Sequence, residues 1–184
     1  MLMFMVYQNM TIRKMTSEEL RAIQAPIKAN YKENPEAGIF TLKVKGTAGE
    51  GITCSIESGK ALIQAGLHPA TGGDGLSVCS GDMLLEALVA CAGVTLKSVA
   101  TAIGFQLNSA EILAEGDLDF RGTLAISKEV PVGFSAIRLH FNIMGEEDPE
   151  KLYNLIRLTE RYCVVLQTLK GGVVTGTTSS LNKL

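Results

Sequence analysis

The chain has 184 residues, 46% of them apolar and 20% charged, with a formal net charge of −2. This composition is ordinary for a globular protein with a sizeable core, and the charge argues against bulk electrostatic binding to nucleic acid or to an anionic membrane surface. No apolar run long enough to cross a bilayer is free of charges and glycine breaks, and no basic segment precedes the apolar start. We therefore expect a soluble, cytoplasmic protein without a membrane segment or an export signal.

The first part of the chain predicts a helix followed by an antiparallel meander. A capping signal at Thr16 and Glu19 opens a short helix, which Pro26 and then Pro35 are expected to end. Strands are expected next, at residues 40–45, 52–58 and 60–66. The turn between the first two strands is expected at the glycines in positions 46, 49 and 51.

The longest helical pattern covers residues 80–103 and is apolar almost all round, with Gly104 as its predicted end. A helix of this kind is expected to be wrapped by the rest of the molecule rather than to lie on its surface. One thiol, that of Cys91, lies near its middle. The loop before this helix, at 68–75, is rich in glycine but lacks the Lys-Ser/Thr pair of a phosphate-binding loop.

The rest of the chain predicts two strands, two helices and a last strand. The expected elements are strands at 107–120 and 130–144, a helix starting at 149, a new short helix from about 163 to 169, and a closing strand at 173–181. This order of elements indicates an α+β fold rather than alternating βαβ units. We expect a single domain over 1–184, with an N-terminal arm and short helix at 1–38 and a core at 39–184.

Four cysteines are the candidate chemical groups, and no pair has the spacing of metal ligands, so no metal or cofactor is expected. The helical neighbours of Cys91 are uncharged, which raises a thiol pKa unless another segment stabilises the thiolate. Cys163 lies where a new helix is expected to begin, and free N–H groups there favour a thiolate. Core packing is the alternative for both, and it is the expected role of Cys54 and Cys79. Spacing alone does not show that any two of the four meet.

The motifs around the long helix resemble those of the OsmC/Ohr family. They are the glycine-rich turn at 72–75, the helix start Ser-Gly-Asp-Met-Leu-Leu-Glu-Ala-Leu-Val-Ala-Cys at 80–91, and the lone Cys163 about seventy residues further on. The resemblance implies antiparallel sheets wrapped around a central apolar helix, in an intertwined homodimer with both active sites at the subunit interface. It covers the chain from about residue 40 to the C-terminus.

The resemblance also implies a thiol-dependent peroxidase of the oxidative stress response. Cys91 would match the peroxidatic cysteine, and Cys163 the resolving cysteine that forms a disulfide with it. The implied partners are a small organic hydroperoxide as substrate and an external dithiol as reductant.

The chain departs from the family pattern at three places. The turn that carries an activating arginine in the family's peroxidases matches residues 47–51, which contain none. The glutamate ten residues before the cysteine falls on Gly81, with Asp82 one place off, and the proline after the second cysteine is Val164. The missing arginine favours an alternative function, a non-enzymatic module of the same fold that binds a small apolar or thiol ligand at the dimer interface. The two retained cysteines favour the peroxidase.

Overall fold

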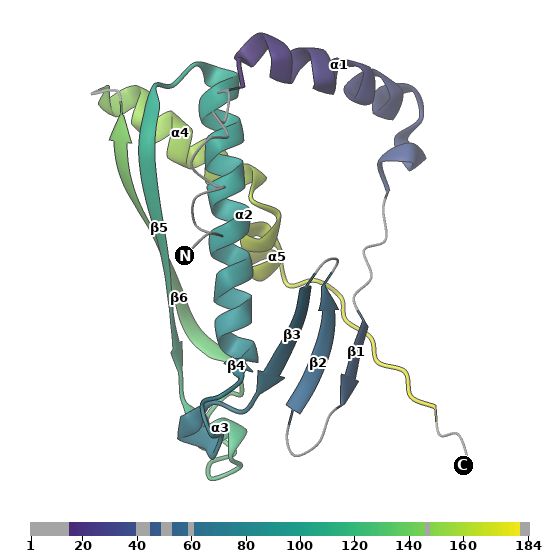
Figure 1. The fold of residues 1–184 in the computed structure, drawn as a ribbon, viewed down its shortest axis with the longest axis vertical. Coiled ribbons are helices and arrows are strands. Elements are labelled where there is room, and N and C mark those ends of the chain that lie inside the picture. The colour runs from purple at the N-terminus through teal and green to yellow at the C-terminus, as the bar shows by residue number, and fades with distance from the viewer. Residues whose placement is uncertain (1–14, 40–44, 49–52, 59–60, 146–147, 181–184) are drawn as a thin grey trace, which may run out of the picture.

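A computed structural model of the chain describes residues 15–39, 45–48, 53–58, 61–145 and 148–180. The fold is a mixture of helices and antiparallel sheet, as the sequence predicts. One long helix, α2 (Ser80–Ile103), runs through the middle of the molecule (Figure 1). A ribbon of two strands lies along one side of it, and two further helices pack near its middle and its C-terminal end.

Helix α2 has the predicted boundaries, and its end follows from glycine chemistry. Gly104 adopts the left-handed conformation (φ 74°), and its N–H donates to the Ala100 carbonyl to close the last turn. One face of the helix is buried, at Leu88, Ala92, Leu96, Val99 and Ala100. The opposite face is not covered by the described chain, and Val94 on it is 74% exposed.

The apolar character of α2 bears on the expectation that the chain has no membrane segment. By length and composition alone this helix is apolar enough to cross a bilayer, as the core helix of a soluble protein also can be. The few charges and glycines of α2 are therefore only weak evidence against a membrane-spanning helix. The described chain covers one face of α2 and buries only 28% of its most apolar window, so wrapping of the whole helix stays a prediction.

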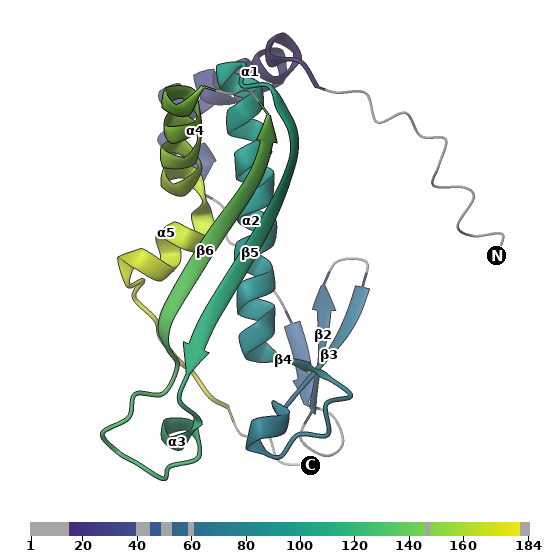
Figure 2. The same cartoon turned by 90° about the vertical axis from the view of Figure 1, so that its left-hand side faces the viewer.

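The two-stranded ribbon supplies the other wall of the core. Strands β5 (Leu107–Leu118) and β6 (Phe134–Gly145) pair antiparallel, with Leu113 opposite His140. Figure 2 shows the ribbon twisting along the length of α2. Apolar side chains such as Ile112 and Phe141 face the helix, while the opposite face is exposed and carries an ionic network. Its members are Glu115, Asp117, Arg138 and His140. The strand predicted at 130–144 is thus formed over Phe134–Gly145, with one face in water.

Helices α4 (Pro149–Tyr162) and α5 (Val164–Gly171) close the core on a further side. The Asp148 carboxylate accepts from the first N–H groups of α4, which confirms the predicted start. Leu155 packs into the core against α2 with no exposed surface. The two helices are separated at Cys163, whose backbone is extended (ψ 104°), so the predicted break is also confirmed. A short helix that the sequence did not predict, α3 (Phe120–Thr123), lies in the connection between β5 and β6.

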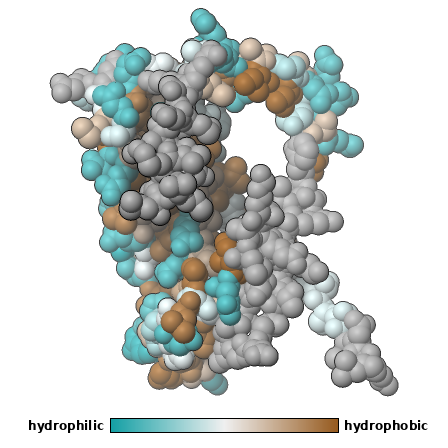
Figure 3. Space-filling model, in the orientation of Figure 1, coloured by the Kyte–Doolittle hydropathy of each residue, from teal (hydrophilic) through white to brown (hydrophobic). Residues whose placement is uncertain are grey.

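The N-terminal helix is longer than predicted. Helix α1 (Ser17–Glu33) begins with the expected capping box between Thr16 and Glu19, followed by a 3-10 turn, η2 (Pro35–Gly38). It continues through Pro26, so the expectation that this proline helps to end the helix is wrong. The helix starts beside the C-terminal end of α2 and runs away from it (Figure 1). Apolar side chains such as Ile23 and Ile27 are exposed along it (Figure 3).

A small sheet precedes α2. Strands β1 (Lys45–Ala48), β2 (Thr53–Ser58) and β3 (Ala61–Gly66) form the predicted antiparallel meander. Gly46 pairs with Ile56 inside β1, so its assignment to the turn is wrong; most of the predicted strand at 40–45 and the glycines at 49 and 51 lie outside the described residues. After a second 3-10 turn, η3 (Pro69–Thr71), the two-residue strand β4 (Val78–Cys79) adds parallel to β3 and leads into α2.

The predicted closing strand is not formed in the described part of the C-terminal segment. Residues 173–180 are exposed and lie in no strand, and Val174 is 97% exposed. Alternating apolar residues form a strand only where a neighbouring edge accepts their backbone hydrogen bonds. No described strand pairs with this segment.

Candidate active site

The structure brings Cys91 and Cys163 together. Cys91 lies in the middle of α2 and is half-buried, while Cys163 lies at the junction of α4 and α5 with no exposed surface. Both belong to one apolar cluster with Leu88 and Ala92 of α2, to which strand residues of β5 and β6 also contribute. The sulfurs are close enough for the Cys163 thiol to donate a hydrogen bond to Cys91. Two thiols 72 positions apart in the sequence therefore share one pocket of the fold.

The surroundings of Cys91 favour its thiolate. Burial raises the pKa of this thiol, but hydrogen-bonding groups outweigh burial and lower the pKa below its usual value. In decreasing order of effect these groups are the Val165 N–H, the Cys163 thiol, the Thr95 hydroxyl and the Val164 N–H. Each can donate to a negative sulfur, and two of them belong to the first turn of α5, where helix N–H groups lack intrahelical partners.

The surroundings of Cys163 have the opposite effect. Burial raises the pKa of this thiol, and the neighbouring Cys91 raises it further, because two negative sulfurs repel each other. The N–H groups of Leu166 and Val165, in the first turn of α5, lower the pKa of Cys163, as expected for a thiol at a helix start. Burial and the neighbouring Cys91 outweigh them, so the net shift is upward and Cys163 stays a thiol that can donate to Cys91.

No arginine is among the described groups that lower the pKa of Cys91. Arg121 forms an ion pair with Asp119 in the connection between β5 and β6. Arg21 lies on the exposed surface of α1. The stabilising groups in the described chain are thus backbone N–H groups, a hydroxyl and a thiol.

The direction of these pKa shifts predicts a pH profile. The rate of alkylation of Cys91 by iodoacetamide should rise with pH and level off with a midpoint below that of an ordinary thiol, about 8.5, because only the thiolate reacts. Cys163 should react at higher pH and more slowly, since it is buried. Peptide mass spectrometry after timed alkylation separates the two sites. A Cys91 midpoint above that of a model thiol would contradict this description of the site.

A cavity of about 630 Å³ lies beside the cysteine cluster, between the start of α2, strand β6 and helix α5. Ile137, Leu139 and Leu166 line it and also pack around Cys163, so they separate the cavity from the thiols by a single layer of side chains. Glu160 and Lys170, which form an ion pair, lie at its polar edge. The cavity suits a mainly apolar molecule with a polar end.

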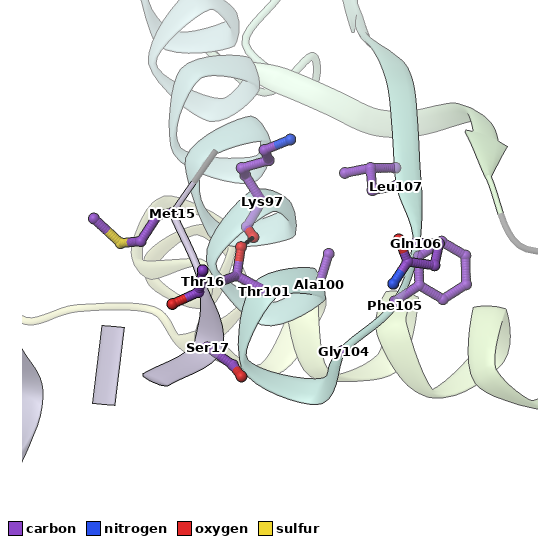
Figure 4. A pocket seen from close by; sticks show the side chains of 10 residues that line it. All are labelled: Met15, Thr16, Ser17, Lys97, Ala100, Thr101, Gly104, Phe105, Gln106 and Leu107. Atoms are coloured by element: carbon purple, nitrogen blue, oxygen red, sulfur yellow. Dashed lines mark hydrogen bonds between the residues drawn. The ribbon is translucent and has the colours of Figure 1, made fainter. Parts of the chain in front are cut away.

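Like the cavity beside the cysteine cluster, two further cavities are lined by neither Cys91 nor Cys163. One of about 310 Å³ lies between Met15 at the start of α1 and the last turns of α2, with the Lys97 side chain beside it (Figure 4). Another, of about 350 Å³, is lined by Cys79 and His68, whose ring stacks on Phe120. Among the described residues no group of three or more His, Cys, Asp or Glu side chains is placed to hold a metal ion.

The groups that act on Cys91 are not evident from the pattern of the sequence. Thr95 follows it by one helical turn, and its side chain could have been placed near the sulfur by helical spacing. The N–H groups of Val164 and Val165 carry no signal in residue type, because every residue except proline has one. Only the packing of α5 against α2 reveals them.

Comparison with known proteins identifies relatives by motif and by fold. The family model described as OsmC-like protein matches residues 72–178, which is more than half of the chain and includes both cysteines. No curated protein matches the chain in sequence.

Several solved structures have a similar fold at low sequence identity. An OsmC-like protein of Mycoplasma pneumoniae superposes with a TM-score of 0.62 at 18% identity, over 72% of this chain and 89% of that one. An organic hydroperoxide resistance protein of Elizabethkingia anophelis gives 0.59 at 16% identity, over 73% and 91% of the two chains. The organic hydroperoxide resistance protein OsmC of Legionella pneumophila gives 0.58 at 18% identity, over 73% and 92%.

Proposed function

Because the chain belongs to the OsmC-like protein family, we propose that it is a thiol-dependent peroxidase that reduces organic hydroperoxides. The single observation that carries the proposal is the juxtaposition of two free thiols of which one has a lowered and the other a raised pKa. A peroxidatic and a resolving cysteine require this asymmetry. The first must attack as a thiolate, while the second must remain a thiol until the sulfenic acid has formed.

In the first step the Cys91 thiolate attacks the terminal oxygen of the hydroperoxide. An S–O bond forms and the O–O bond breaks, so the sulfur is oxidised to a sulfenic acid and the peroxide leaves as an alkoxide, which takes a proton to become an alcohol. The N–H groups of Val165 and Val164 stabilise the thiolate before attack.

In the second step the Cys163 sulfur attacks the Cys91 sulfenic acid. A disulfide forms, and the hydroxyl group takes the thiol proton and leaves as water. An external dithiol then reduces the disulfide in two exchange steps and is itself oxidised to a disulfide, which returns both cysteines to thiols.

An organic rather than an inorganic peroxide is supported by the apolar surroundings. The cluster around the thiols is built from apolar side chains of α2, β5, β6 and α5, and the adjacent cavity is mainly apolar. Two of the proteins of similar fold are organic hydroperoxide resistance proteins. We place the protein in the cytoplasm, where dithiol reductants keep such cysteines reduced.

We further propose that the protein acts as a homodimer. The uncovered face of α2, with Val94 at 74% exposure, offers an apolar surface for a second copy. In such a dimer the partner chain would cover this face, and residues of both chains would surround the thiols.

Turnover with two peroxides tests the proposed function. With dithiothreitol in excess, the protein should consume cumene hydroperoxide catalytically and faster than hydrogen peroxide, because apolar surroundings favour an apolar substrate. Peroxide concentration is followed by an iron–xylenol orange assay. No consumption above the rate of dithiothreitol alone would reject the peroxidase.

Two observations favour the alternative, a non-enzymatic module that binds a small apolar or thiol ligand. The cavity beside β6 and α5 is large enough for a ligand, and no arginine is among the described groups that act on Cys91. Failure of the turnover assay, together with saturable binding of an apolar fluorescent probe, would favour the module.

A further inference from the structure

Two cavities meet at the side chain of Phe134, the first residue of β6. One is the cavity of about 630 Å³ beside the cysteine cluster, and the other is the cavity of about 350 Å³ lined by Cys79 and His68. Leu84, Gly133 and Phe134 line both of them. These three residues therefore form a wall between the two cavities.

The ring of Phe134 spans the space between β5 and α2, because each of these elements has a glycine there. On β5, a Cβ atom added to Gly116 would overlap the Cδ1 and Cε1 atoms of the ring, so the ring lies directly on the strand backbone. On α2, a Cβ atom added to Gly81 would lie 3.5 Å from Cζ at the tip of the ring. The ring thus touches the strand along its side and the helix at its tip, and closes the space between them.

The larger cavity is long and mainly apolar. The β6 residues from Phe134 to Leu139 contribute to its lining, a stretch of about 17 Å at about 3.4 Å per residue. Leu166 and Leu169 of α5 line it from the other side. Phe134 lies at one end of this stretch, so its ring closes that end of the cavity. A straight hydrocarbon chain fits such a space better than a compact ring system does.

The charges at the cavity indicate the head group of a ligand. Among the described residues that line it, the charged ones are Glu160 and Lys170, whose Oε2 and Nζ atoms are 3.6 Å apart. A charged head would be repelled by one member of this pair. A hydroxyl group, in contrast, can accept from Lys170 and donate to Glu160.

We propose that the larger cavity binds a linear aliphatic molecule with an uncharged polar head, and that Phe134 is the residue that limits the length of its chain. A chain that fills the larger cavity meets the ring and cannot continue into the smaller one. Without the tip of the ring the two cavities join, and a longer chain can be buried. The inference deepens the ligand-binding alternative given under the proposed function, and it requires no reaction at Cys91.

The variant Phe134→Leu tests the limit on chain length. Leucine lacks the Cε and Cζ atoms, and Cζ is the atom that reaches Gly81, so the wall opens while the inner part of the side chain remains. Phe120→Leu is the matched control, because the same substitution is then made in the smaller cavity, where this ring stacks on His68, and the wall stays intact. The readout is displacement of a bound fluorescent naphthylamine from the full-length protein by hexanol, octanol, decanol and dodecanol.

In the wild type, affinity should rise by up to about fourfold for each methylene that becomes buried, and then level off once the chain reaches the ring. In Phe134→Leu the rise should continue for at least one more alcohol of the series, so that the longest alcohol binds about tenfold tighter than it binds to the wild type. Phe120→Leu should level off at the same alcohol as the wild type. The same limit in wild type and folded Phe134→Leu would overturn the inference.

Two further measurements do not depend on a variant. Octanol should displace the naphthylamine at least about threefold more effectively than octanoate or octylamine, because each charged head is repelled by one member of the ion pair. Tighter binding of either charged compound contradicts the proposed head group. Wild-type protein that binds none of the alcohols saturably, or that shows no limit across the series, overturns the inference even if circular dichroism finds Phe134→Leu unfolded. No peroxide is present, so the outcome is independent of peroxidase activity.

Discussion

Replacing Cys91 with serine is expected to abolish catalytic consumption of cumene hydroperoxide, with a loss of about a thousandfold or more. A serine hydroxyl at the same place is not ionised at neutral pH and is a poor nucleophile toward an O–O bond. The N–H groups at the start of α5 would then face a neutral oxygen rather than a thiolate. The measurement is peroxide consumption with excess dithiothreitol.

Cys79→Ser is the matched control for this variant. Cys79 is also a free, half-buried thiol, but it lies at the start of α2 beside a different cavity, outside the cluster that holds Cys91 and Cys163. It should retain the wild-type rate. Equal losses in the two variants, or activity in Cys91→Ser, would show that another group reacts with the peroxide.

Replacing Cys163 with alanine is expected to separate the two oxidation steps. The first equivalent of peroxide should still form a sulfenic acid at Cys91, but without a resolving thiol this acid persists, reacts with dimedone and goes on to sulfinic acid in excess peroxide. The rate of the first step should also fall at neutral pH, because the Cys163 thiol is one of the donors that lower the pKa of Cys91. Mass spectrometry of the Cys91 peptide follows each product.

Alanine is preferred to serine at position 163 because this side chain is fully buried in an apolar cluster. A buried hydroxyl without a partner costs about 1–3 kcal/mol and could unfold the junction. Val165→Ala, which changes a neighbouring side chain but keeps both thiols, is the control and should still form the disulfide. Persistent disulfide at Cys91 in Cys163→Ala would identify a different resolving cysteine.

Much of the fold could be predicted from local patterns. The apolar run ending at Gly104 defines α2, the alternation around Arg138 defines β6, and Asp148 with Pro149 defines the start of α4. These signals work because each reflects a local requirement of backbone geometry or burial. The new helix expected from about residue 163 places a break at Cys163, and the site depends on this break.

Two predicted elements differ from the structure for different reasons. Pro26 does not end α1, because a proline removes one hydrogen bond of the helix and the turns on either side of it persist. The closing strand over 173–180 does not form, because its pattern needs a partner edge that the described chain does not supply.

The site itself could be predicted only in part. The resemblance names Cys91 and Cys163, but the helical neighbours of Cys91 alone imply an inert thiol, since none is charged. The pKa of Cys91 is instead lowered, and the first N–H groups of α5 are among the causes. Backbone N–H groups from a distant segment cannot be recognised from composition or residue spacing. Their effect on the pKa of Cys91 is therefore visible only in the folded structure.

The most direct measurement is a count of thiols in the wild-type protein before and after one equivalent of cumene hydroperoxide, with the oxidised peptides identified by mass spectrometry. The account predicts the loss of two thiols per chain and a disulfide between Cys91 and Cys163. An unchanged number of thiols after prolonged exposure, or a disulfide that omits Cys91, would contradict it.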